Sequence, residues 1–74
     1  MEVEIRLFAG LRKGRFKKRR VDLPEGCRLR EVLDDLAIEE EDVSLPLVNG
    51  QFSDMGRELK PGDVLAVFPA VGGG

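Results

Sequence analysis

The sequence predicts an α+β fold in which one helix packs across a mixed sheet of four or five strands. Three observations support this prediction: an alternating segment near the start, a single amphipathic helical stripe in the first half, and a continuous apolar segment close to the end. With 74 residues, the chain is expected to form one domain with one modest core, which leaves little room for a deep internal active site.

Apolar and charged residues alternate in the first segment, whose apolar members are Val3, Ile5 and Leu7. A period of two predicts a strand with one buried face. Phe8 breaks the alternation, so its side chain is expected on the opposite face. Gly10 and Gly14 bracket a predicted turn, and residues 17–23 are expected to return as the second strand of a hairpin.

One helix is predicted after the turn signal at residues 23–26 (Leu-Pro-Glu-Gly). Its apolar stripe, spaced i, i+3, i+4 and i+7, consists of Leu29, Val32, Leu33 and Leu36. This spacing predicts one face packed against a core. Cys27 occupies the expected N-cap position, where a thiol is a poorer cap than Ser or Thr. The acidic residues 39–42 are expected to form a solvated connection.

The second half of the chain predicts a hairpin followed by a central strand. Residues 45–48 are expected to form a short strand, Asn49-Gly50 favours a type I′ turn, and residues 51–52 begin the return arm. Pro61-Gly62 is typical of a type II turn. Residues 64–68 are apolar without alternation, so both faces of this last strand are expected to be covered.

Pro69 is expected to end the strand pairing because it has no N–H group. The last strand is predicted to lie centrally and to run parallel to the first. A hairpin, a helix, further strands and a central last strand form the β-grasp, or ubiquitin-like, arrangement. We therefore predict a β-grasp domain at residues 1–69 and a flexible tail at residues 70–74.

Charge is distributed unevenly along the chain, although the net charge is only −2. Seven of the twelve basic residues fall within 12–20, and seven of the fourteen acidic residues fall within 31–42, so an electrostatically lopsided molecule is expected. No apolar run is long enough to span a membrane, and the start does not resemble a signal peptide. The single Cys27 cannot form an internal disulfide. A cytoplasmic location is therefore expected, without a membrane partner.

The side chains offer little catalytic chemistry. The sequence has no His, Tyr or Trp, and Cys27 therefore has no His to activate it. No phosphate-binding loop or metal-ligand cluster is evident. A self-sufficient enzyme is not expected, and neither is a bound metal or cofactor. Cys27 could be a reactive thiol at a helix start, but a structural role fits it better.

The basic run Lys17-Lys18-Arg19-Arg20 has three interpretations. It could bind nucleic acid, form a solvated hairpin, or dock on an acidic partner surface, where charge mainly raises the association rate. Phe16 is the one aromatic residue beside the run, and the net charge is negative. Nucleic-acid binding is therefore not expected.

The three closing glycines, Gly72, Gly73 and Gly74, are the strongest functional signal. Glycine has no side chain and a permissive backbone, so this end could enter a tunnel too narrow for other residues. Its carboxylate needs activation, for example as an acyl-adenylate, before a sulfur or nitrogen nucleophile can displace AMP. Terminal glycines can also be a frayed end. Because these glycines follow a predicted central strand in a chain without catalytic groups, we favour the functional interpretation.

Several segments match a known family: residues 3–12 (VEIRLFAGLR), 23–26 (LPEG), 47–50 (LVNG), 59–64 (LKPGDV) and 68–74 (FPAVGGG). Through them the sequence resembles the MoaD/ThiS family of sulfur carriers nearly from end to end. The branch that it resembles most is that of molybdopterin synthase small subunits. The closing segment is the most specific, because those subunits typically end in Phe/Ile-Pro-Pro-Val-small-Gly-Gly.

The resemblance implies that Gly73 and Gly74 are the reactive pair and that Gly72 is the small residue before them. An E1-like (MoeB-like) partner enzyme would adenylate the Gly74 carboxylate with ATP, and sulfur would replace one oxygen to give a thiocarboxylate. The charged tail would then enter the large subunit of molybdopterin synthase (MoaE-like). There it would donate sulfur to the precursor pterin in molybdenum cofactor biosynthesis, and the carrier itself would bind neither metal nor cofactor.

The resemblance also implies a partner-binding surface made of Phe8, Phe68, Pro69, Val71 and Gly72. From the residues alone, Phe8 could equally pack under the hairpin, and Phe68 fits the core better than an interface. Phe52 could extend an apolar docking patch or make only a hairpin contact. Two departures from the family are Ala70, where a second proline is usual, and the strongly basic segment 12–20.

Three other functions share parts of this evidence. A thiamine-pathway sulfur carrier has the same fold and the same Gly-Gly end. A ubiquitin-like protein modifier would use the same activated carboxylate, with a lysine amine as the nucleophile. A nucleic-acid-binding module would depend on residues 17–20 and would not need the tail.

Overall fold

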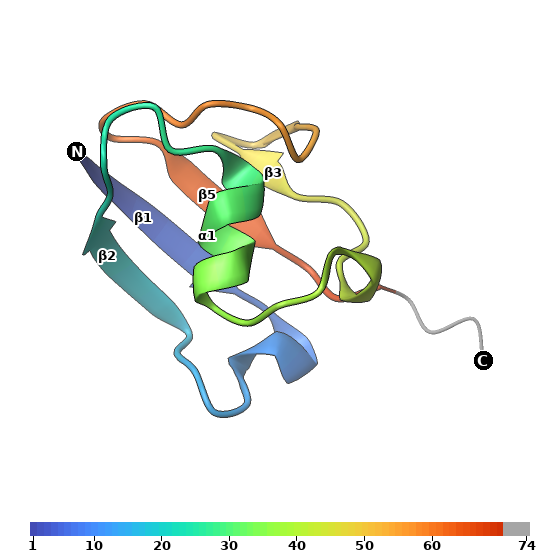
Figure 1. The fold of residues 1–74 in the computed structure, drawn as a ribbon. Coiled ribbons are helices and arrows are strands. Elements are labelled where there is room, and N and C mark those ends of the chain that lie inside the picture. Colours follow the sequence, from blue (N-terminus) through green and yellow to red (C-terminus); the bar gives the residue numbers. More distant parts are fainter. Residues whose placement is uncertain (71–74) are drawn as a thin grey trace.

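A five-stranded mixed sheet in the order β2-β1-β5-β3-β4 carries helix α1 across one face (Figure 1). The computed structural model describes residues 1–70 of the chain. Its strands and its α-helix are β1 (Glu2–Leu7), β2 (Lys18–Asp22), α1 (Leu29–Asp35), β3 (Leu47–Val48), β4 (Gln51–Phe52) and β5 (Val64–Val67). Two short 3-10 helices also lie in the chain, η1 (Ala9–Arg12) and η2 (Glu40–Asp42). This architecture is the predicted β-grasp fold.

Strand β5 lies in the middle of the sheet and runs parallel to β1, as predicted. Ile5 pairs with Leu65, and Leu7 pairs with Val67. On the far side of β1, β2 runs antiparallel to it, and on the far side of β5, β3 and then β4 complete the sheet. The chain therefore reaches its C-terminal segment from the centre of the sheet.

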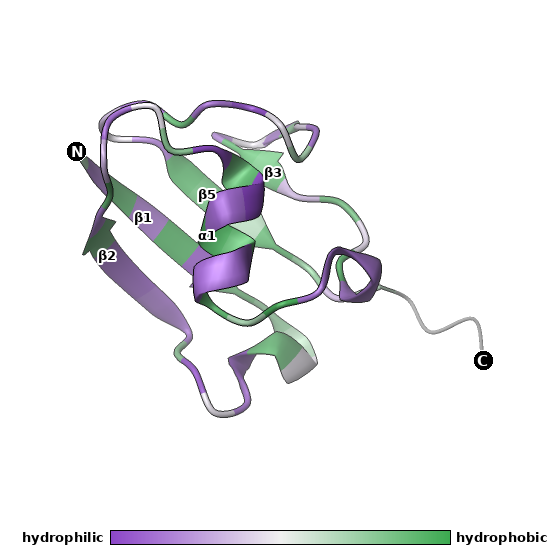
Figure 2. Cartoon of the chain, viewed as in Figure 1, coloured by the Kyte–Doolittle hydropathy of each residue, from purple (hydrophilic) through white to green (hydrophobic). Residues whose placement is uncertain are grey.

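The core lies between the sheet and α1 and is formed by apolar residues of both, which Figure 2 colours green. The side chains that are almost completely buried are Val3, Ile5, Leu7, Leu29, Val32, Leu33, Val48, Leu65 and Val67. They come from the alternating residues of β1, the helical stripe and the inner faces of β3 and β5. Burial of each such side chain contributes about 1.5–3 kcal/mol, so the predicted periodicities account for the packing.

The start of α1 corrects one prediction, because Arg28 rather than Cys27 is the N-cap. The Glu31 carboxylate accepts a hydrogen bond from the Arg28 backbone N–H at 3.1 Å. This contact satisfies a backbone donor that the helix leaves unpaired. The side chain of Cys27 is instead buried in the core, with 4% of its surface exposed.

The end of α1 is a Schellman motif with alanine in the position that usually holds glycine. Ala37 has φ 57°, and its N–H donates to the Asp34 carbonyl at 3.0 Å. The N–H of Ile38 donates to the Leu33 carbonyl at 2.9 Å, which completes the motif. The guanidinium of Arg15 donates to the Ala37 carbonyl at 3.1 Å. A cation therefore lies at the negative end of the helix.

Burial along β5 differs from the expectation that both of its faces are covered. Leu65 and Val67 are fully buried, whereas Val64 and Ala66 are half-buried. The helix packs against one face only, so the continuous apolar sequence does not imply two covered faces.

Two boundaries also differ from the predictions. The strand expected at residues 45–48 is restricted to β3, and Leu45 is 47% exposed. The turn expected between Gly10 and Gly14 includes most of η1, which buries Leu11.

The two glycine turns of the second half have the predicted geometry. Asn49 and Gly50 have φ 53° and 82°, and a type I′ turn requires both angles to be positive. Gly62 has φ 84°, and the Asp63 N–H donates to the Lys60 carbonyl at 3.1 Å to close the turn. These turns set the register of β3 against β4 and aim the chain into β5.

Candidate functional site

The face of the sheet that points away from α1 is apolar along β5 and β3. Because side chains alternate between faces along a strand, Val64 and Ala66 lie on this face. Ala66 pairs with Leu47, and Leu47 pairs with Phe52, and cross-strand partners share a face. Phe52 is 68% exposed, so its position favours an extended apolar surface over a purely local hairpin contact. We call this surface the apolar strip, and its residues are Leu47, Phe52, Val64 and Ala66.

An aromatic pair continues the strip where β1 and β5 end. The rings of Phe8 and Phe68 stack with centroids 4.3 Å apart and planes 13° apart. The Phe8 N–H donates to the Val67 carbonyl at 3.2 Å, which holds Phe8 beside β5. Phe8 leaves the buried face of β1, as predicted. The expectation that Phe68 belongs to the core is wrong, because it lies outside the buried cluster and is only half-buried.

Backbone contacts hold the segment that follows β5. The Ser44 N–H donates to the Phe68 carbonyl at 2.9 Å, and the Ala70 N–H donates to the Asp42 carbonyl at 2.7 Å. Pro69 forms an isolated bridge with Val43. The expectation that Pro69 ends the pairing is therefore wrong, because the Phe68 carbonyl before it and the Ala70 N–H after it both make backbone hydrogen bonds. The direction of the chain is fixed as far as Ala70.

Four of the predicted site residues, Val71, Gly72, Gly73 and Gly74, lie outside the described residues. The predicted division between a domain at 1–69 and a tail at 70–74 stays a prediction. Of the other site residues, the structure brings Phe8, Phe68 and Pro69 together at one edge of the apolar strip. Sequence reasoning missed the contribution of η2, since only folding brings its Asp42 to Ala70.

A groove with basic walls adjoins the aromatic pair. It has a volume of about 400 Å³ and is lined by Arg6, Phe8, Arg12, Lys17 and Lys18. The Arg12 guanidinium lies 5.3 Å from the centre of the Phe8 ring, and its Nε donates to the Leu7 carbonyl at 2.7 Å. Sequence reasoning counted Arg12 only as part of a basic segment. The spacing of four residues between Phe8 and Arg12 is the sequence signal that could have indicated this contact.

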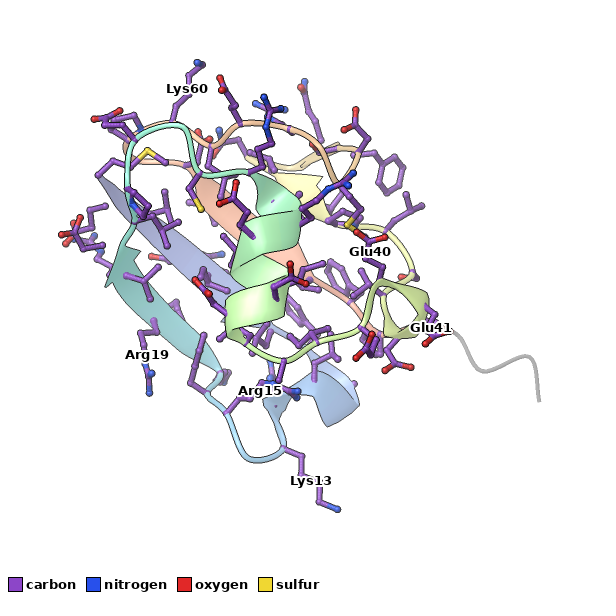
Figure 3. The ribbon with its side chains drawn as sticks, in the orientation of Figure 1. Lys13, Arg15, Arg19, Glu40, Glu41 and Lys60 are labelled. Carbon is purple, nitrogen blue, oxygen red and sulfur yellow. The ribbon has the colours of Figure 1, made fainter. Side chains whose placement is uncertain are left out.

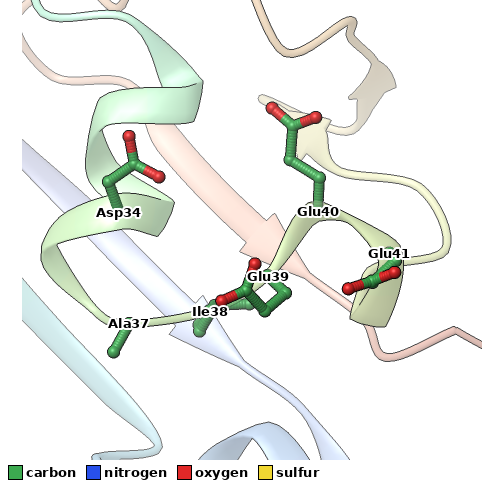
Figure 4. Close-up of a pocket in the computed structure, with 6 residues that line it drawn as sticks. All are labelled: Asp34, Ala37, Ile38, Glu39, Glu40 and Glu41. Carbon is green, nitrogen blue, oxygen red and sulfur yellow. The ribbon is translucent and has the colours of Figure 1, made fainter.

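A second hollow, of about 500 Å³, lies between the end of α1 and η2 (Figure 4). Asp34, Glu39, Glu40 and Glu41 give it exposed carboxylates (Figure 4). Within residues 1–70, no three acidic or cysteine side chains are grouped so that they could hold a metal ion. None of the helices in that range could cross a bilayer.

Cys27 is not placed for nucleophilic chemistry. Burial raises the pKa of its thiol, and the nearby carboxylates of Glu31 and Asp35 raise this pKa further. A thiol in this environment stays protonated and unreactive near neutral pH. The structural role that the sequence favoured for Cys27 is therefore supported by its burial, although it is not the helix cap.

The fold and the apolar strip beside the chain's exit from the sheet define a ubiquitin-like β-grasp protein. The family model described as the ThiS family matches residues 5–74. The chain belongs to this family, and more broadly to the MoaD/ThiS group of ubiquitin-like sulfur carriers. The comparison with curated protein sequences gave no match.

Three solved structures show the same fold over nearly the whole chain. A Pyrococcus furiosus protein assigned as molybdopterin converting factor subunit 1 is 32% identical, with a TM-score of 0.79, and the match covers 96% of this chain and 99% of the other. Small archaeal modifier protein 1 of Haloferax volcanii is 26% identical, with a TM-score of 0.76, and the match covers 95% of this chain and 98% of the other. A chain of the complex of subunits 1 and 2 of the molybdopterin-converting factor from Helicobacter pylori is 27% identical, with a TM-score of 0.67, and the match covers the whole of both chains (100% and 100%).

Proposed function

We propose that this protein is the sulfur-carrying small subunit of a molybdopterin synthase, with the carboxylate of Gly74 as its reactive group. The observation that carries the proposal is the path of the chain after β5. Phe68 and Ala70 are hydrogen bonded to the segment 42–44, and the chain leaves the sheet beside a partly exposed apolar strip. A partner that docks on this strip would receive the closing glycines in a defined direction.

The proposed reaction begins with activation of Gly74 by an E1-like (MoeB-like) enzyme in the cytoplasm. A carboxylate oxygen attacks the α-phosphorus of ATP, and pyrophosphate leaves. Hydrosulfide, HS⁻, supplied by a sulfur donor, then attacks the acyl carbon; the bond to AMP breaks, AMP leaves, and loss of the S–H proton yields the thiocarboxylate. Activation is needed because a carboxylate is a poor electrophile, whereas AMP is a good leaving group. The ATP is held by the partner, and the carrier itself uses no cofactor.

In the second step the thiocarboxylate donates its sulfur to the precursor pterin inside the large subunit (MoaE-like). The relative from Helicobacter pylori comes from a complex of subunits 1 and 2 of molybdopterin-converting factor, which supports a partner of this kind. We propose that Phe8, Phe68 and Pro69 form the contact with the large subunit. Val71 and Gly72 would continue this contact into the channel that receives Gly73 and Gly74.

A second candidate function is protein modification. It is favoured by the likeness to small archaeal modifier protein 1. The same acyl-adenylate would then be attacked by a lysine amine instead of sulfur, and the product would be an isopeptide bond. The thiamine pathway is a further destination for the sulfur, since a thiamine-pathway carrier would have the same fold and the same Gly-Gly end.

Intact-protein mass spectrometry distinguishes these functions. The chain is incubated with an E1-like activating enzyme, ATP and a sulfur donor. A mass gain equal to the exchange of one oxygen for one sulfur is expected, whereas adducts joined through lysine would favour the modifier. Transfer of the sulfur to precursor pterin by the large subunit would then separate the pterin pathway from the thiamine pathway.

Two tail variants provide the control. Deletion of Gly74, and addition of one residue after it, are both expected to abolish the mass gain. Their folds should be unchanged, because the core and the sheet lie within residues 1–70. Normal sulfur loading of either variant would refute the assignment of the reactive group.

A further inference from the structure

We propose that the groove lined by Arg6, Phe8, Arg12, Lys17 and Lys18 binds an acidic segment of the protein that receives the tail. The expected segment has Asp or Glu side chains interleaved with apolar ones. The identity of the receiving protein rests on the proposed function. The preference of the groove for an acidic and apolar segment rests on the described residues alone.

Ion pairs neutralise two of the basic side chains on the β1–β2 surface, one of which, Arg6, lines the groove. Arg20 lies 3.6 Å from Glu2, and Arg6 is paired with Glu4. Lys17 and Lys18 take part in none of the ion pairs formed among residues 1–70. Both are exposed. The unneutralised charge is therefore concentrated at the end of the sheet where the chain also exits.

Phe8 joins this charge to the apolar strip, because its ring is shared by the two surfaces. It lines the basic groove and stacks on Phe68. Arg12 is oriented by its hydrogen bond to the Leu7 carbonyl, so its cation is held at the rim of the groove. A partner with an apolar residue on the aromatic pair would thus place its neighbouring side chains in the groove. Carboxylates would be favoured there by charge complementarity.

Nucleic acid fits this surface less well than an acidic protein segment. Proteins that bind single strands combine basic grooves with aromatic rings on which bases stack. The ring of Phe16 is covered by Arg19, whose guanidinium carbon lies 4.5 Å from the ring centre, and Phe8 already stacks on Phe68. The all-acidic η2 is held beside the chain exit by the hydrogen bond from the Ala70 N–H to the Asp42 carbonyl, and its carboxylates would repel phosphates.

The test is an NMR titration of the isotope-labelled full chain with a short synthetic peptide in which glutamate and leucine alternate. We expect shift changes at Phe8, Arg12, Lys17 and Lys18, and weaker binding as salt is added. The variant with both Lys17→Glu and Lys18→Glu should bind the peptide roughly tenfold less tightly. Lys60→Glu, combined with Lys13→Glu, is the matched control with the same change in net charge, since both lysines lie outside the groove (Figure 3), and it should bind normally.

Three results of the peptide titrations would overturn the inference: no shift changes at the groove, equal loss of binding in the control variant, or equal binding of a peptide with glutamine in place of glutamate. Preferential binding of a single-stranded RNA oligonucleotide at the same residues would also overturn it, in favour of nucleic acid. The mass-spectrometric test of sulfur loading is independent of this titration. A groove that does not bind the acidic peptide can therefore be distinguished from a chain that does not accept sulfur.

Discussion

Asn49 and Asp63 are joined by a hydrogen bond of 2.9 Å from Nδ2 to Oδ1, which ties the tip of the β3–β4 hairpin to the residue before β5. Each side chain also binds backbone: Asp63 Oδ2 accepts from the Lys60 N–H at 2.8 Å, and Asn49 Oδ1 accepts from the Val64 N–H at 2.9 Å. Asp63 is buried, with 7% of its surface exposed. This pair therefore fixes the approach of the chain to the central strand.

We expect Asp63→Ala to lower the free energy of unfolding by about 2–3 kcal/mol, because the Lys60 N–H and the Asn49 amide lose their acceptors. Asp34→Ala, at an exposed helix position, should change it by no more than about 0.5 kcal/mol. Urea unfolding followed by circular dichroism measures both. Similar losses in the two variants would show that the hydrogen bonds of Asp63 contribute little.

The matching change on the other side of the pair is Asn49→Gly, which keeps a residue that tolerates the positive φ of 53°. It should lower the free energy of unfolding by about 1–2 kcal/mol, because the Val64 N–H loses its side-chain acceptor. Combined with Asp63→Ala, the total loss should be smaller than the sum, because the two variants remove one shared bond. Strict additivity would mean that the two side chains act independently.

The stacked rings of Phe8 and Phe68 are expected to anchor the large subunit. Phe8→Asp should weaken binding at least about tenfold, since aromatic rings that become buried in an interface often carry much of its binding energy. Isothermal titration calorimetry with the large subunit measures the effect. Phe52→Asp tests how far the docking surface extends, and Asp34→Ala, outside the apolar strip, is the control. Unchanged binding of the Phe8 variant, once its fold is verified, would remove Phe8 from the interface.

The order of elements could be predicted from the sequence because it depends on local signals. The alternation of Val3, Ile5 and Leu7 specifies one buried face of β1. The pairs Asn49-Gly50 and Pro61-Gly62 specify turn types through their backbone preferences. The central position of β5 followed from its apolar composition, and the structure confirms it.

The parts that could not be predicted depend on contacts between distant residues. An unbroken apolar run does not reveal which face of a strand is covered. The sequence therefore could not show that Phe68 lies outside the core. The hydrogen bond from Ala70 to Asp42 depends on how η2 folds back beside the end of β5. The groove likewise arises because residues 6–8, residue 12 and residues 17–18 meet only in the folded sheet.

Ala37 offers a stabilising substitution at the end of α1. Its φ of 57° lies in the left-handed region, which strains residues that carry a Cβ. Ala37→Gly should therefore raise the free energy of unfolding by up to about 1 kcal/mol, the strain relieved exceeding the added flexibility of the unfolded chain. Ala66→Gly, inside β5, should lower it by a similar amount. Thermal unfolding compares them, and a destabilised Ala37→Gly variant would contradict the strain argument.

The buried thiol of Cys27 predicts a loss of stability at alkaline pH. Burial, followed by the Glu31 and Asp35 carboxylates, raises the pKa of this thiol in the folded state. An unfolded cysteine ionises at about pH 8.5. The stability that the raised folded-state pKa contributes is therefore fully present below that pH and is lost as the pH rises towards the folded-state pKa. Cys27→Ala removes this titration, although it lowers stability at every pH by leaving a small cavity. Urea unfolding between about pH 7 and pH 10 should therefore give a steeper alkaline decline for the wild type than for the variant. Parallel declines would show that the Cys27 thiol ionises with equal ease in the folded and unfolded chains.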